Sequence, residues 1–85
     1  MIMKKTVKRF GIVSQTVITD PELSLQTKGI YSILCTYADK DRICYPSANT
    51  VADLANVSVR TVRRSIKELK EFNYLTRKGK YIILE

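Results

Sequence analysis

Two serine-capped runs lie back to back in the stretch SANTVADLANVSVRTVRRSIKEL, and this pattern limits the possible folds more than any other in the chain. Serine is a favoured helix N-cap, and Ser47 and Ser58 each precede apolar residues at helical spacing. The first run ends at about Ala55 and the second at about Phe72. Asn56 lies in the turn between them, where asparagine is the best substitute for glycine in a left-handed conformation. The pattern predicts a helix-turn-helix.

The second of these helices, residues 58–72, separates apolar from basic side chains. At about 100° per residue its apolar positions share one side. These positions are Val59, Val62, Ile66, Leu69 and Phe72. The opposite side carries Arg60, Arg64 and Lys67, with Thr61 and Arg63 on its flanks. An exposed helix fits the DNA major groove, where arginine can donate two hydrogen bonds to guanine. The alternative interpretation is a solvated face, which is common on exposed helices.

The remaining residues predict one more helix and a C-terminal hairpin. LSLQTKGIYSILCTYAD has helical spacing after Ser24, a plausible N-cap. Within it, Gly29 either lets another backbone come close or is merely tolerated. ICYP reads as a very short strand, and two β-rich runs, Tyr74–Arg77 and Lys80–Leu84, flank a Lys-Gly turn. Residues 1–20 predict an extended arm, with a short strand near Arg9–Val13.

Three helices closed by a hairpin describe a winged helix-turn-helix. The expected fold class is therefore mainly α with a small β-hairpin as the C-terminal wing. We divide the chain into an N-terminal extended arm or strand, residues 1–20, and a winged helix-turn-helix domain, residues 21–85. The chain has 85 residues, and a domain of this size can bury only one small core.

The net charge of +7 is concentrated at the two ends of the chain. Residues 1–20 hold four basic side chains and one acidic side chain. Residues 21–57 hold three basic and four acidic side chains, and residues 58–85 hold eight basic and three acidic ones. This distribution favours a polyanion as the partner, with nucleic acid ahead of a membrane surface. Arg77, Lys78 and Lys80 crowd the tip of the predicted wing, which predicts contact with the sugar-phosphate backbone or a minor groove. Lys4, Lys5, Lys8 and Arg9 form a further basic patch on the arm.

Other function classes find little support in the residues. The chain has no histidine and only two cysteines, Cys35 and Cys44, which cannot complete a usual zinc site. We expect Cys35 in the core and Cys44 partly buried. Asp39 and Asp41 form a close acidic pair within a polar loop, and three glycines make no phosphate loop. We therefore expect no catalytic residues, no metal or other cofactor and no small-molecule substrate. Without an export signal or a membrane span, we expect a cytoplasmic protein with reduced thiols.

The segments LSLQTKGIYSILCTYAD, CYPS and TVADLANVSVRTVRRSIKELKEFNYL resemble the winged helix-turn-helix module of phage and plasmid replication initiators. Replisome organisers and related small bacterial DNA-binding regulators carry the same module, and the resemblance covers about Phe10 to Leu84. It implies recognition-helix positions at Ser58, Arg60, Thr61, Arg63 and Arg64, and backbone contacts at Ser47 and Thr50. Two departures are Ser14, where such modules often have proline, and Asn73, where a glycine often ends the third helix.

Two kinds of function compete. The first is binding of double-stranded DNA, as a transcription regulator or as the origin-binding domain of a replication initiator. The alternative is a protein-interaction module in a replisome or partition complex, which predicts an exposed apolar patch and weak DNA affinity. A homodimer on two half-sites and contacts with replication proteins are left open as further partners.

Overall fold

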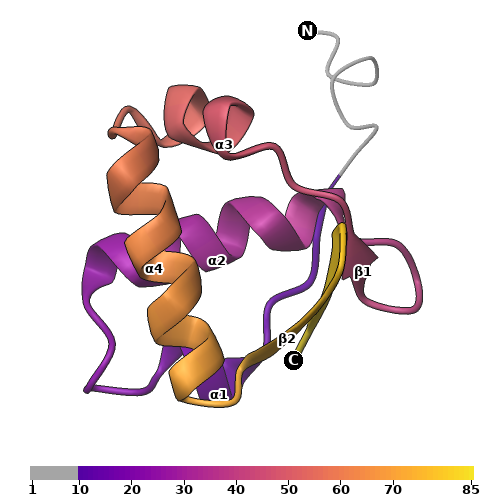
Figure 1. Cartoon of the computed structure of the whole chain (residues 1–85). Coiled ribbons are helices and arrows are strands. Elements are labelled where there is room, and N and C mark those ends of the chain that lie inside the picture. Colours follow the sequence, from indigo (N-terminus) through magenta and orange to yellow (C-terminus); the bar gives the residue numbers. More distant parts are fainter. Residues whose placement is uncertain (1–9) are drawn as a thin grey trace, which may run out of the picture.

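Three longer helices and one short helix pack around one small core, and a three-stranded sheet closes one side of it (Figure 1). The computed structural model describes residues 10–85. Helix α4 crosses α2, and α3 contacts both of them. The elements are α1 (Gln15–Ile18), α2 (Leu25–Tyr37), β1 (Ile43–Cys44), α3 (Ala48–Ala55), α4 (Val59–Glu71), β2 (Leu75–Lys78) and β3 (Tyr81–Leu84). The predicted winged helix-turn-helix fold is confirmed.

Each of the three longer helices begins with the same Ser-x-x-Thr signature. The serine hydroxyl oxygen accepts the N–H of the threonine three residues later, which satisfies one free donor of the first turn. The pairs are Ser24 with Thr27 at 3.1 Å, Ser47 with Thr50 at 3.4 Å and Ser58 with Thr61 at 3.1 Å. All three predicted N-caps are confirmed.

Asparagines end the second and third of these helices in a left-handed conformation. Asn56 has φ 59° and ψ 44°, and Asn73 has φ 64°. After α3 the N–H of Val57 donates to the carbonyl of Ala52 at 3.0 Å, and after α4 the N–H of Tyr74 donates to that of Leu69 at 2.8 Å. These bonds are those of a Schellman motif. The turn prediction at Asn56 is confirmed, and Asn73 fills the place of the expected glycine.

The sheet is antiparallel, with strand order β1-β3-β2. The predicted hairpin turns at Gly79, whose φ of +61° suits glycine, but Lys80 belongs to the turn and Tyr74 precedes the strand. The predicted short strand forms as β1 and pairs Cys44 with Ile82 of β3. This pairing, which adds a third strand to the wing, was not predicted.

The core joins all layers of the fold. Its largest fully buried side chains are Tyr31, Ile30, Leu34, Leu69 and Ile82. Cys35 is buried as expected, and Cys44 is buried more completely than expected, with 1 % exposed. Burial raises the pKa of the Cys44 thiol to about 11, so this cysteine is a core side chain and not a nucleophile.

The N-terminal segment contains an unpredicted helix. The expectation of extended chain is wrong at α1, whose Val17 is fully buried in the common core. Residues 10–13 form no strand, and the rest of the predicted arm, with its four basic residues, lies outside the described residues. Here Gly11 allows the close backbone approach that Gly29 does not, since a Cβ at Gly11 would lie 2.6 Å from the carbonyl oxygen of Cys35.

Arg42 joins both ends of the described chain. Its guanidinium donates to the main-chain oxygens of Ile12 and Glu85, each at 2.8 Å. The buried hydroxyl of Tyr31 accepts the N–H of Ser14 at 3.0 Å and donates to the same Glu85 oxygen at 2.9 Å. Arg42 therefore helps to hold the fold together through hydrogen bonds to residues far from it in the sequence.

Candidate nucleic-acid interface

Helix α4 presents a row of cations to solvent and buries its other side. Arg60, Arg63, Arg64 and Lys67 are all exposed, while Val62 and Leu69 are fully buried. Among residues 10–85 no carboxylate forms an ion pair with any of these four cations. Their charge is therefore available to an external anion. The predicted separation of apolar and basic sides is confirmed.

Capping side chains stabilise the first turn of each helix in the helix-turn-helix. Ser47, Thr50 and Ser58 are exposed, and Thr61 is half-buried. The Ser58 hydroxyl also bonds the Thr61 hydroxyl at 3.0 Å. These hydroxyl groups already stabilise the helix starts, so an incoming phosphate would meet the remaining free N–H groups of each first turn.

The wing places its basic residues on two faces. Leu75 pairs with Leu84 and Arg77 with Ile82, so Arg77 shares the face that packs against the helices. Lys78 pairs with Tyr81 and projects from the opposite face, and Lys80 lies in the turn. All three cations are exposed. The hairpin therefore carries one cation on the face that includes Leu75 and Ile82, and two around its tip.

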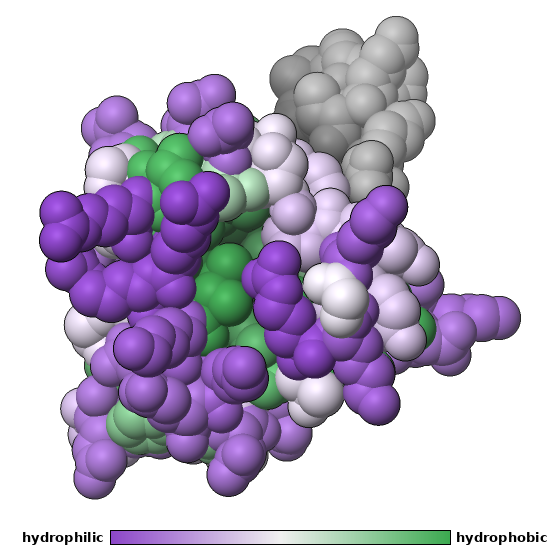
Figure 2. Space-filling view, in the orientation of Figure 1, coloured by the Kyte–Doolittle hydropathy of each residue, from purple (hydrophilic) through white to green (hydrophobic). Residues whose placement is uncertain are grey.

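One face of the molecule combines the helix and the wing. Figure 2 shows hydrophilic side chains gathered over α4 and over the hairpin, with a hollow floored by hydrophobic residues between them. All the predicted site residues belong to α3 and its N-cap, the turn, α4 or the hairpin. The predicted site residues thus belong to one contiguous module, although the first and last of them, Ser47 and Lys80, are 33 positions apart in the chain.

Sequence reasoning missed a polar contact behind this face. Glu68 lies on α4, one turn after Arg64. In the structure its carboxylate accepts a 2.6 Å hydrogen bond from the hydroxyl of buried Thr27 on α2. A threonine at the third position of a helix carries no local signal of such a contact, because the partner lies 41 residues away.

Two further features, a metal site and a membrane-spanning helix, are absent from the described part of the chain. In residues 10–85 no three His, Cys, Asp or Glu side chains come together as a metal site would require. No helix in this range has the length and apolar character needed to cross a bilayer.

Comparison with known proteins places the module in a family. A family model described as a helix-turn-helix domain matches residues 22–75, from just before α2 to the first residue of β2. No curated protein and no solved structure gave a match. The matched region is more than half of the chain and contains α2 and the whole helix-turn-helix of α3, the turn and α4. The chain therefore belongs to this helix-turn-helix domain family, whose fold is a DNA-binding one.

Proposed function

We propose that this chain is a sequence-specific binder of double-stranded DNA, which inserts α4 into the major groove and lays the β2–β3 hairpin on the sugar-phosphate backbone. The observation that carries this proposal is the row of four exposed cations on α4, opposite its buried side, none of which pairs with a carboxylate of the described residues 10–85. A helix of this kind has the diameter to enter the groove, and its arginines have the geometry to read guanine.

Phosphate contacts supply most of the affinity in this proposal. Exposed cations on α4 and on the hairpin would release counterions from the DNA backbone. If about five phosphates are engaged, the logarithm of the binding constant falls against the logarithm of salt concentration with a slope of about −4 to −5. Arg60 and Arg64 then add base discrimination, with Thr61, Arg63 and Lys67 beside them.

For the biological role we propose a transcription regulator or the origin-binding domain of a phage or plasmid replication initiator. The support is the resemblance of the CYPS and VSVRTVRRSIKEL segments to that module. Both roles use the same DNA face. A homodimer on two half-sites and contacts with replication proteins are compatible with either role.

One observation favours the alternative, a protein-interaction module. Leu25 is 85 % exposed at the start of α2, beside an apolar groove lined by Gly29, Ile33, Ala55 and Val57. This exposed apolar surface is the feature that the alternative predicted. The groove lies along α2 and the turn, and Gln26 lines both this groove and the cleft that Arg64 and Lys67 line.

The decisive experiment starts with selection of bound duplexes from a random pool, followed by binding measurements with Arg60→Ala and Arg64→Ala. Each substitution removes one candidate bidentate contact, so we expect the preference for the selected site over random DNA to fall by about tenfold or more. Lys70→Ala is the matched control, because it removes an exposed cation from the flank of the same helix.

The outcome separates the two functions. If both arginine variants keep the parent's preference, α4 does not read bases in the way proposed. If the parent shows no preference and binds only at the non-specific level of about 10⁻⁴ to 10⁻⁶ M, the interaction module becomes the better account.

A further inference from the structure

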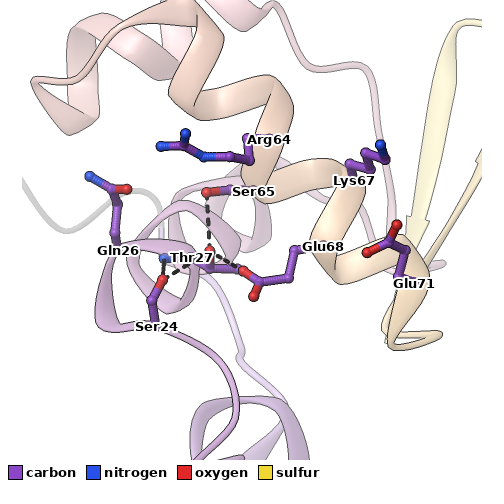
Figure 3. Close-up of a pocket in the computed structure, with 8 residues that line it drawn as sticks. All are labelled: Ser24, Gln26, Thr27, Arg64, Ser65, Lys67, Glu68 and Glu71. Atoms are coloured by element: carbon purple, nitrogen blue, oxygen red, sulfur yellow. Dashed lines mark hydrogen bonds between the residues drawn. The ribbon is translucent and has the colours of Figure 1, made fainter.

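A small polar cluster lies between α2 and α4, behind the basic face (Figure 3). Thr27 and Ser65 are each 3 % exposed, and Glu68 is half-buried beside them. The Thr27 hydroxyl lies 2.6 Å from the Glu68 carboxylate oxygen, 3.1 Å from the Ser65 hydroxyl and 3.1 Å from the Ser24 hydroxyl. One threonine of α2 therefore contacts two residues of α4.

The hydrogen-bond chemistry fixes the direction of these contacts. An ionised carboxylate can only accept, and a hydroxyl has one hydrogen to donate. Thr27 therefore donates to Glu68 and accepts from the two serines. Within residues 10–85 no buried side-chain polar atom lacks a partner. The cluster is thus saturated, and loss of the Thr27 hydroxyl would leave Ser65 and Glu68 without their shared partner.

These contacts fix α4 in a way that apolar packing does not. Hydrophobic burial between α2 and α4 is non-directional, so it tolerates small rotations and shifts along the helix axis. Hydrogen bonds from Thr27 to positions three residues apart on α4 restrict both movements, because both distances must be kept at once.

The same part of α4 holds a candidate base-reading residue. Arg64 directly precedes Ser65 and lies one turn before Glu68, and all three line a cleft of about 460 Å³. In Figure 3 the Arg64 side chain extends from α4 above this cleft, towards Gln26 of α2. A rotation of α4 that broke the Thr27 contacts would displace the Arg64 guanidinium with it.

We propose that Thr27 is a positioning residue for base recognition, which holds α4 through Ser65 and Glu68 at the rotation and height at which Arg64 reads its base. This inference rests on the proposed function. It assigns specificity to a residue that touches no DNA.

The test compares the ratio of affinities for selected and random duplexes at one salt concentration. Thr27→Val keeps the shape of the side chain and removes the hydroxyl, and we expect it to lower the ratio by about tenfold, as loss of one base contact would. Thr27→Ser keeps the hydroxyl and should restore the ratio. Glu68→Met removes the acceptor and should repeat the loss, whereas Glu68→Gln keeps an acceptor oxygen and should not.

Ile30→Val is the control for stability, because it trims a fully buried side chain of α2 and leaves the cluster intact. An equal loss of specificity in Ile30→Val would overturn the inference, as would a parental ratio in Thr27→Val. If Thr27→Val fails to fold, the half-buried position of Glu68 lets the Glu68 variants decide the matter alone. If Arg64→Ala lowers the ratio and the cluster variants do not, only this inference fails. If Arg64→Ala has no effect, this inference fails, and if Arg60→Ala has none either, the proposed function fails with it.

Discussion

At the scale of single residues, backbone conformation decides which side chains the helix-turn-helix accepts. Asn56 and Asn73 occupy left-handed positions at the ends of α3 and α4, where most L-residues are strained. Asparagine is the natural substitute for glycine there, because its short polar side chain tolerates this region. The turn that sets the angle between the two DNA-binding helices therefore depends on one residue.

Asn56→Ala should lower the free energy of unfolding by about 1 kcal/mol, because alanine lacks the tolerance of asparagine for a positive φ. Asn56→Gly should differ little from the parent. Urea denaturation measures both. Asn49→Ala, at an exposed helical position of α3, is the control and should have no cost, since alanine is the better helix former. Equal stability of Asn56→Ala and the parent would contradict the role given to this turn.

At the scale of elements, the register of the hairpin distributes the wing cations. Because side chains alternate along a strand, Arg77 faces the helices and Lys78 faces away from them. The hairpin is short, so its tip suits phosphates better than bases. Pairing of β1 with β3 gives the wing a third strand, which stabilises a hairpin that would be marginal alone.

Lys78→Ala should weaken binding to all duplexes alike and reduce the magnitude of the salt slope by about 1, because one phosphate contact is lost. A gel-shift titration against salt, with selected and random duplexes, measures both effects. Lys40→Ala removes an exposed cation from the loop before β1 and serves as the control. A loss confined to the selected site would mean that the wing reads bases.

At the scale of the whole molecule, a few long-range hydrogen bonds tie the N-terminal segment to the winged domain. The hydroxyl of Tyr74, just before β2, donates to the Asp20 carboxylate at 2.6 Å. This hydrogen bond, and to a lesser extent the one from the N–H of Glu22, lowers the pKa of Asp20 below its ordinary 3.8. The Asp20 carboxylate in turn raises the pKa of Tyr74 above 10.0.

The sign of each shift sets a pH window for stability. A lowered Asp20 pKa stabilises the fold above pH 3.8, and this contribution is lost as the pH falls through the lower folded value. A raised Tyr74 pKa stabilises the fold below pH 10.0, and this contribution is lost as the pH rises through the higher folded value.

Tyr74→Phe should therefore lower the urea midpoint near pH 7 and differ less from the parent at about pH 2. Tyr45→Phe, which alters an exposed phenol, should match the parent at both pH values. A Tyr74→Phe deficit that is unchanged at low pH would contradict this linkage.

The sequence by itself determined the features that depend on neighbours within about four residues. Ser24, Ser47 and Ser58 cap helices because each hydroxyl reaches an N–H three residues on. The cations of α4 point outwards because helical spacing separates them from Val62 and Leu69. The hairpin followed from the glycine between two β-rich runs, although three of the four strand ends lie one residue later than predicted.

Only the tertiary structure decided the contacts between distant residues, since no local pattern records which segments will meet. The burial of Val17 in α1, the pairing of β1 with β3 and the close approach of Gly11 to Cys35 all depend on how the layers pack. The Thr27 to Glu68 bond depends on the angle between α2 and α4. Local chemistry thus placed charge on one helix, whereas packing alone set the orientation in which that helix is held.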